Sequence, residues 1–263
     1  CAQTLAALSV GGMATLAFGT IGMLASQDGG RMAGYGAIIS SGTLLAVIGH
    51  SGSAVLASGL YYLLGSTLAM AAFMLLIELT ERIRPPGAAL IAITMEAFAI
   101  EDKPEEPVGV GIPGSLAFLG LSFAACALVI SGMPPLAGFV AKFSLFHAML
   151  ASAAEAHGNV PARTWVLIAL MVTGGLAAII ALMRLGVRTF WAAGAVTPPR
   201  LQVSEALPVT ALMLLCVLLT VQAGTVFDYL GRTVDGLARN ADYAARVLGE
   251  PPVLRAPAAE GAR

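Results

Sequence analysis

Long segments without a charged residue constrain this chain of 263 residues more than any other feature. Four segments contain no Asp, Glu, Lys or Arg, namely residues 1–27, 32–77, 164–183 and 206–227. A fifth, between residues 107 and 154, contains only Lys142. A helix of about 20 predominantly apolar residues can cross the hydrocarbon core of a bilayer. Only 11% of the residues are charged, whereas soluble domains contain roughly a quarter. The sequence therefore predicts an all-α integral membrane protein.

The composition also argues against several other classes of protein. The net charge is −1 and no cluster of basic residues occurs, which disfavours a nucleic-acid partner. The three cysteines, Cys1, Cys126 and Cys216, are far apart and predict neither a disulfide framework nor a metal site. Since no nucleotide loop, zinc-ligand spacing or nucleophile motif is present, we expect no bound cofactor and a protein that is not an enzyme.

Basic residues indicate how often the chain crosses the membrane. They occur in three loops, which contain Arg31, then Arg82, Arg84 and Lys103, then Arg184, Arg188 and Arg200. The positive-inside rule places all three loops on the cytoplasmic side. An even number of crossings must then separate residue 84 from residue 184. Because 164–183 is one crossing, 112–152 must be one as well. Six crossings are predicted, over residues 4–25, 32–49, 54–78, 112–152, 164–183 and 206–224.

The crossing at 112–152 contains two adjacent prolines, Pro134 and Pro135. Each proline lacks a backbone donor and clashes with the preceding turn, so a continuous helix is disfavoured at this point. The sequence therefore predicts a transmembrane helix that is broken near its middle.

Two polar segments accompany the predicted membrane domain, which covers residues 1–224. The acidic segment 82–111 is predicted to be a cytoplasmic loop that contains a short surface helix over residues 88–99. The tail 225–263 has oppositely charged residues three or four positions apart, which is typical of an amphipathic helix with a salt-bridged face. Its Pro- and Ala-rich end is expected to be disordered, and the crossing count places the tail outside the cytoplasm.

Lys142 is the one fully charged side chain well inside a predicted span. Placing an ammonium in hydrocarbon costs roughly 2.5–3.5 kcal/mol on insertion scales, so such a residue usually faces water or a partner. Desolvation disfavours the charged form of a lysine, which suits a proton relay. The alternative is a lysine that reaches the membrane surface.

Ser66 and Thr67, in the middle of a span, either hold water or bond to their own helix. His50 is either a solvated turn residue or part of a pore mouth.

Several segments resemble the antiporter-like subunits that respiratory complex I shares with Mrp-type cation/proton antiporters. The most specific is residues 132–143, Gly-Met-Pro-Pro-Leu-Ala-Gly-Phe-Val-Ala-Lys-Phe, which is similar to the broken-helix motif of this superfamily. The segments that favour the D-type subunit of the Mrp (also Mnh or Pha) antiporters are Arg188-Thr189-Phe190-Trp191 and residues 205–224. The chain begins at Cys1 without a Met or a basic start, and we expect residue 1 to lie inside a longer protein.

The resemblance implies a fold of fourteen helices with two inverted repeats, of which this chain would form the last six. It assigns the broken-helix motif to Pro134, Pro135, Gly138 and Phe139, and it places Lys142 at the position of a proton-exchanging lysine or glutamate. This sequence departs from the family pattern at four positions where relatives often have lysine or histidine, namely Gly30, Ser40, Gly65 and Met70. Either waters beside Ser40, Ser66 and Thr67 would then carry the proton to Lys142, or the proton path through this repeat would be less active.

The function implied is that of one subunit in a multisubunit antiporter, which couples proton entry to export of Na⁺ or another monovalent cation. Its partners would be the other antiporter subunits and the lipid of a bacterial inner membrane. One alternative is a proton-pumping subunit of complex I or of a membrane-bound hydrogenase. Another is a structural or assembly subunit without an ion path of its own.

Overall fold

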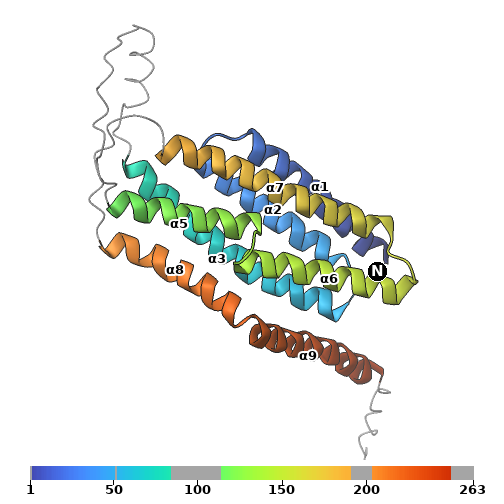
Figure 1. The fold of residues 1–263 in the computed structure, drawn as a ribbon. Coiled ribbons are helices and arrows are strands. Elements are labelled where there is room, and N and C mark those ends of the chain that lie inside the picture. Colours follow the sequence, from blue (N-terminus) through green and yellow to red (C-terminus); the bar gives the residue numbers. More distant parts are fainter. Residues whose placement is uncertain (1, 51, 84–113, 191–202, 250–263) are drawn as a thin grey trace, which may run out of the picture.

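The computed structural model describes residues 2–50, 52–83, 114–190 and 203–249, and these residues form eight α-helices packed as a bundle (Figure 1). The helices are α1 (Ala2–Ala25), α2 (Gly29–Ile48), α3 (Ser53–Ile83), α5 (Gly114–Ser131), α6 (Ala137–His157), α7 (Ala162–Phe190), α8 (Val203–Val221) and α9 (Ala223–Gly249). Seven of them, all except α9, are long and apolar enough to cross a membrane. The prediction of an all-α membrane protein is confirmed.

The ends of the predicted spans lie close to those of the observed helices, except that α3, α6 and α7 continue further at their C-terminal ends, to Ile83, His157 and Phe190. Residues 82 and 83, which we expected in the loop 82–111, form the last turn of α3. The rest of that loop, its expected surface helix at 88–99, and the tail beyond residue 249 lie outside the described residues.

The helices α5 and α6 follow one another along the bundle, with a short non-helical turn between them (Figure 1). The long helix α3 packs against both of them, and so does α7. The two helices therefore lie as the halves of one helix that is broken between Ser131 and Ala137. Each half is by itself long and apolar enough to cross a membrane, so the count of six crossings stays a prediction.

Three arginines lie near the end of the bundle where α2 begins and α7 ends, and two of them tie the α1–α2 corner to α7. Arg184 donates from Nη2 to the carbonyls of Leu24, at 2.7 Å, and Ser26, at 2.6 Å, which satisfies the C-terminal end of α1. Arg188 donates from Nη1 to Gln27 Oε1 at 2.7 Å. The third, Arg31, donates its backbone N–H to a side-chain oxygen of the preceding Asp28, which caps α2.

Glycines bring α1 and α2 into close contact along much of their length. A Cβ added at Gly12 would collide with the backbone of Ala46, and one at Gly42 would lie 2.6 Å from the Leu16 nitrogen. Small residues serve the same purpose wherever membrane helices pack backbone against backbone. This pair forms one side of the space that surrounds the helix break.

The amphipathic helix α9 begins directly after α8 and packs on α3 through Leu230, Val234 and Phe227. Its described charged residues Asp228, Arg232 and Asp235 are exposed. Tyr61 of α3 holds the junction in place, because its ring stacks on Phe227 with centroids 4.3 Å apart and its hydroxyl donates to the Leu219 carbonyl at 2.9 Å.

We expect Tyr61→Phe in the full-length subunit to lower the free energy of unfolding by about 0.5–1.5 kcal/mol, the net contribution of one hydrogen bond. Thermal unfolding of the assembled complex would measure this change. Tyr229→Phe is the matched control, because Tyr229 is 69% exposed on α9. Equal midpoints for Tyr61→Phe and the wild type would show that this hydrogen bond does not stabilise the α8–α9 junction.

Candidate functional site

The C-terminal end of α5 is closed by a glycine turn. Gly132 adopts a left-handed conformation with φ 77°, which glycine accepts without strain. Its N–H donates to the Val129 carbonyl at 3.2 Å, and the Met133 N–H donates to the Leu128 carbonyl at 3.0 Å. These two bonds make a Schellman motif, which ends the helix just before the prolines.

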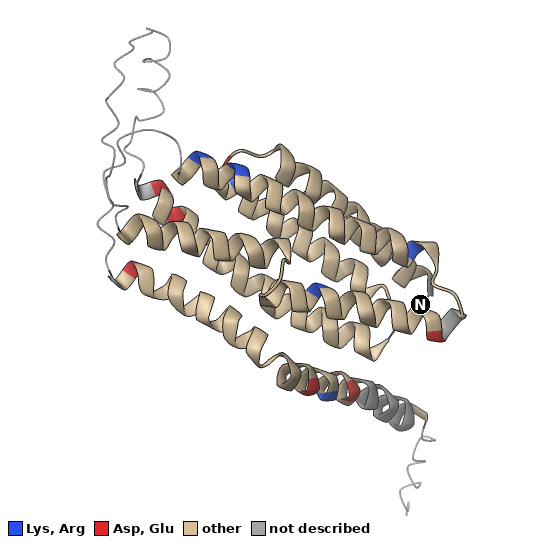
Figure 2. Ribbon diagram, viewed as in Figure 1, with Lys and Arg blue, Asp and Glu red and all other residues tan. Residues whose placement is uncertain are grey.

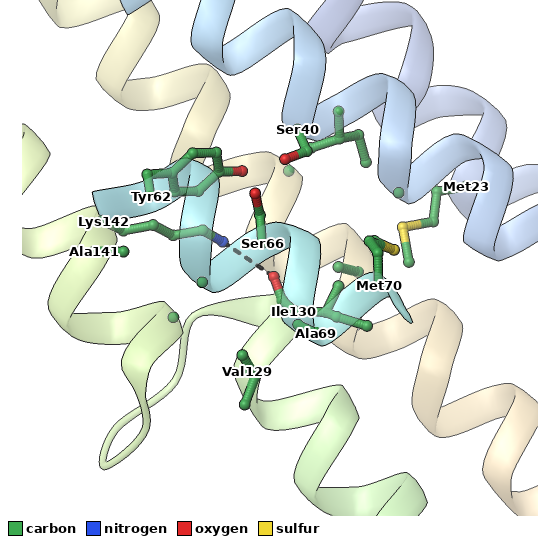
Figure 3. A pocket seen from close by; sticks show the side chains of 16 residues that line it. Met23, Ser40, Tyr62, Ser66, Ala69, Met70, Val129, Ile130, Ala141 and Lys142 are labelled. Atoms are coloured by element: carbon green, nitrogen blue, oxygen red, sulfur yellow. Dashed lines mark hydrogen bonds between the residues drawn. The ribbon is translucent and has the colours of Figure 1, made fainter. Parts of the chain in front are cut away.

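Lys142 donates hydrogen bonds to the next two carbonyls of α5, after the two that accept from the glycine turn. From α6 its side chain reaches back toward α5, where Nζ donates to the Ser131 carbonyl at 2.7 Å. Nζ also donates to the Ile130 carbonyl at 3.3 Å (Figure 3). The reach is natural because side chains on a helix tilt toward its N-terminus. The ammonium therefore lies at the negative end of the α5 dipole, where positive charge is stabilised.

Three glycines leave room for this arrangement. An added Cβ at Gly132 would lie 2.9 Å from Lys142 Nζ, and one at Gly175 of α7 would lie 2.6 Å from the Ser131 oxygen and 3.2 Å from Nζ. A Cβ at Gly138 would collide with the Val129 carbonyl. The lysine, the end of α5 and the backbone of α7 can meet only because these positions lack side chains.

A cavity adjoins Lys142 and is bounded by α1, α2, α3, α5, α6 and α7. Its polar lining side chains, among the described residues, are Lys142 together with Ser40, Tyr62 and Ser66. The three hydroxyls come from α2 and α3 and point into the same space (Figure 3). Tyr62 is 6% exposed, and its hydroxyl interacts with the side chains of Ser40 and Thr43. The cavity therefore offers a set of neutral oxygens opposite a single cation.

The structure brings together some of the sequence-predicted residues and separates others. Ser40 and Ser66 line the cavity with Lys142, and the Ser66 hydroxyl also donates to the Leu63 carbonyl of its own helix at 3.2 Å. Thr67 lies outside the cavity lining and is exposed, and its hydroxyl likewise donates to its own helix, at the carbonyls of Leu63 and Leu64. Tyr62 also lines the cavity and was not predicted as a site residue, although a tyrosine inside a predicted span is a signal that could have identified it.

The motif residues at the break have different surroundings. Pro134 and Pro135 form the exposed turn between α5 and α6. Gly138 is buried in the first turn of α6 against α5, and Phe139 stacks on Phe143 with centroids 5.8 Å apart. The glycine turn therefore ends the first half-helix, the prolines occupy the turn that follows it, and Gly138 allows the second half-helix to start beside the first.

Three of the four positions that depart from the family pattern face the cavity, namely Ser40, Gly65 and Met70. Met70 fills the space beside Gly36. Gly30 lies outside it, next to Asp28 at the start of α2. Among the described lining residues, Tyr62 is the one titratable group besides Lys142.

His50 lies at the far end of α2, between α2 and α7. Its Nδ1 is 3.0 Å from the Ala46 carbonyl and its Nε2 is 3.5 Å from Thr164 Oγ1. Burial lowers the pKa of His50, the hydrogen bond to Ala46 opposes this effect, and the charge of Arg163 adds to it. The neutral imidazole is therefore favoured, with Nδ1 donating to Ala46. His50 takes no part in the lining of the Lys142 cavity.

The bundle has the fold of a known class of membrane subunit. It superposes on a chain of the solved Mrp complex from Dietzia sp. DQ12-45-1b with a TM-score of 0.68 and 18% sequence identity, over 94% of this chain and 50% of that one. This similarity shows that the chain shares its fold, including the helix break, with a chain of that complex. No family model matches the chain.

Sequence comparison confirms the resemblance to the D-type antiporter subunits. The chain is 48% identical over 93% of its length to the D subunit of a probable K⁺/H⁺ antiporter of Rhizobium meliloti (strain 1021). It is 25% identical over 90% of its length to the D subunit of the Na⁺/H⁺ antiporter of Bacillus subtilis (strain 168). It spans slightly less than half of each relative, namely 46% and 43% of their lengths.

Proposed function

We propose that this chain is the ion-translocating part of the D-type subunit of a monovalent cation/proton antiporter, and that Lys142 is its proton relay. The observation that carries the proposal is the hydrogen bonding of the Lys142 ammonium to the end of a broken helix beside a polar cavity. Half-helix ends inside a membrane are typical ion sites of secondary transporters. K⁺ is the first cation to test, because the relative at 48% identity is named for K⁺ and the one at 25% for Na⁺.

In this proposal the protonated Lys142 rests on the carbonyls of Ile130 and Ser131, and it releases its proton into the cavity beside Ser40, Tyr62 and Ser66. Water held by these hydroxyls would carry the proton, since no carboxylate or imidazole is found among the described residues that line the cavity. Transport would require the other subunits of the antiporter in a bacterial membrane. It would need no redox cofactor, in contrast to a complex I-like assembly.

Lys142→Ala is expected to abolish antiport, because the variant has no group at the helix break that binds and releases a proton. Everted vesicles that contain the full-length subunit with its partner subunits would be given a proton gradient without an NADH-driven enzyme. Addition of K⁺ or Na⁺ should dissipate the gradient in the wild type, as followed by fluorescence dequenching, and at least tenfold more slowly in the variant.

The matched control is His147→Ala, which changes an exposed residue on the same helix. It should retain dequenching. Equal dequenching in Lys142→Ala and the wild type would refute the relay and make Lys142 a structural residue. A fully assembled wild type that does not respond to either cation would refute the antiporter assignment and favour the redox-driven relatives.

A further inference from the structure

The carbonyl pair that holds Lys142 has the properties of a cation site in its own right. The Leu128 and Val129 carbonyls accept backbone N–H groups from the glycine turn, whereas the next two, of Ile130 and Ser131, accept the ammonium. Both belong to the last turn of α5, where the helix dipole adds negative potential. The ammonium is in effect a tethered monovalent cation, and its contacts identify the atoms that would bind a free one.

We propose that the carbonyl oxygens of Ile130 and Ser131 form the binding site for the transported monovalent cation, and that the Lys142 ammonium and this cation occupy the site in turn. The inference rests on the proposed function and specifies where its cargo binds. Unwound carbonyls and half-helix C-terminal ends are chemically suited to such ions, because they supply neutral oxygen ligands at membrane depth.

Further ligands for a dehydrated cation are available across the cavity. The hydroxyls of Ser66, Tyr62 and Ser40 lie on α3 and α2, opposite the end of α5 (Figure 3). Neutral oxygen ligands can replace the hydration shell of K⁺ and Na⁺. The cavity lining contains no carboxylate among the described residues, which disfavours a divalent ion.

Simultaneous occupation by both cations is prevented by geometry and charge. The ammonium is 2.7 Å from the Ser131 oxygen, and the backbone of Gly175 closes the space on the α7 side. A second positive charge on the same oxygens would be strongly repelled in a site of low dielectric constant. Exchange therefore proceeds when an Nζ–H bond breaks, the proton leaves through the cavity, and the neutral amine gives up the carbonyls to the incoming cation.

The described groups that face Lys142 add no second proton to this exchange. From α2 and α3 they are Ser40, Tyr62 and Ser66, of which only the phenol titrates, and a neutral phenol adds no charge near pH 7. From α1 and α7 the described lining residues are Met23, Gly174 and Ala178, which are apolar.

Equilibrium binding of radioactive Rb⁺, as a probe for K⁺, to the purified complex with the full-length subunit tests the proposal. In the pH range where Lys142 is protonated, wild-type affinity at this site should fall about tenfold for each pH unit of acidification, the slope for one proton exchanged for one cation. Lys142→Ala should bind one additional Rb⁺ per complex at low pH, and the site should no longer depend on pH. If that variant does not assemble, Lys142→Gln removes the charge and serves the same comparison.

A second substitution in the Lys142→Ala background tests whether the additional Rb⁺ ion binds at these carbonyls. Gly175→Ala places a Cβ 2.6 Å from the Ser131 oxygen and should weaken the additional Rb⁺ site at least tenfold. Gly120→Ala is the matched control on α5, because the nearest atom to its Cβ would be 4.0 Å away. It should leave the additional site intact.

Two results would overturn the proposal. One is Rb⁺ binding in Lys142→Ala that equals the wild type at every pH, and the other is an equal effect of Gly175→Ala and Gly120→Ala. If antiport in vesicles still requires Lys142 when either result is found, the proposed function stands and the carbonyl site is wrong. If vesicles that contain the assembled wild type show no antiport, the proposed function itself fails.

Discussion

Gly138→Ala is expected to abolish antiport and to destabilise the assembled complex. The added Cβ would collide with the carbonyl oxygen of Val129 and approach its carbonyl carbon and Cα, all of which are backbone atoms of the other half-helix. Backbone cannot move aside as the end of a flexible side chain can, so α6 must shift away from α5. Over-packing of this kind typically costs about 1–3 kcal/mol. The shift would also carry Lys142 away from the carbonyls of Ile130 and Ser131.

Two measurements on the full-length subunit in its complex check this prediction, namely the thermal unfolding midpoint and cation-dependent dequenching in vesicles. Gly34→Ala, on α2, is the control, because an added Cβ there would meet nothing within 4 Å. If Gly138→Ala retains wild-type dequenching, the close apposition of the two half-helices is not required for transport.

Gly12→Val is expected to prevent stable packing of α1 against α2. Even the Cβ of valine would overlap the backbone of Ala46 and lie 2.8 Å from the Gly42 carbonyl oxygen, and its two methyl groups need further space. Association of membrane helices depends on such close packing, because lipid offers apolar side chains as favourable an environment as a neighbouring helix does. We expect several-fold less subunit in the assembled complex, measured by co-purification with its partner subunits.

The preceding residue provides the control for this experiment. Gly11 is exposed on the same helix, and an added Cβ there would meet nothing within 4 Å. Gly11→Val has the same change in volume and helix propensity, so it should assemble normally. Equal assembly of the two variants would mean that the α1–α2 contact does not decide whether the subunit is incorporated.

Much of this architecture could be predicted because it depends on composition and on local backbone chemistry. The charge-free segments located the spans, since a bilayer requires length and apolarity more than a particular sequence. Pro134 and Pro135 predicted the break, and the even number of crossings between basic loops assigned α5 and α6 to one crossing. Lys142 was conspicuous because no other charge lies so far from a helix end in the predicted spans.

The contacts of the site could not be predicted, because they depend on how each helix is rotated about its axis. In α3, apolar residues occur on every face, so periodicity does not tell which side meets the cavity and which meets lipid. Ser66 and Thr67 are neighbours in sequence, yet Ser66 lines the cavity and Thr67 is exposed. Tyr62, one turn earlier, is placed in the cavity by the packing of α3 on α2 and α6.

Among the described residues of the seven helices other than α9, Lys142 is the one charged side chain far from the two ends of the bundle (Figure 2). A membrane potential performs work of about 2.3 kcal/mol per elementary charge for each 100 mV that the charge crosses. Loss of one proton from Lys142 and entry of one monovalent cation leave the charge at this depth unchanged. One-for-one exchange at the break would therefore be electrically silent, and any voltage dependence of the whole antiporter would arise from charge moved elsewhere in the assembly.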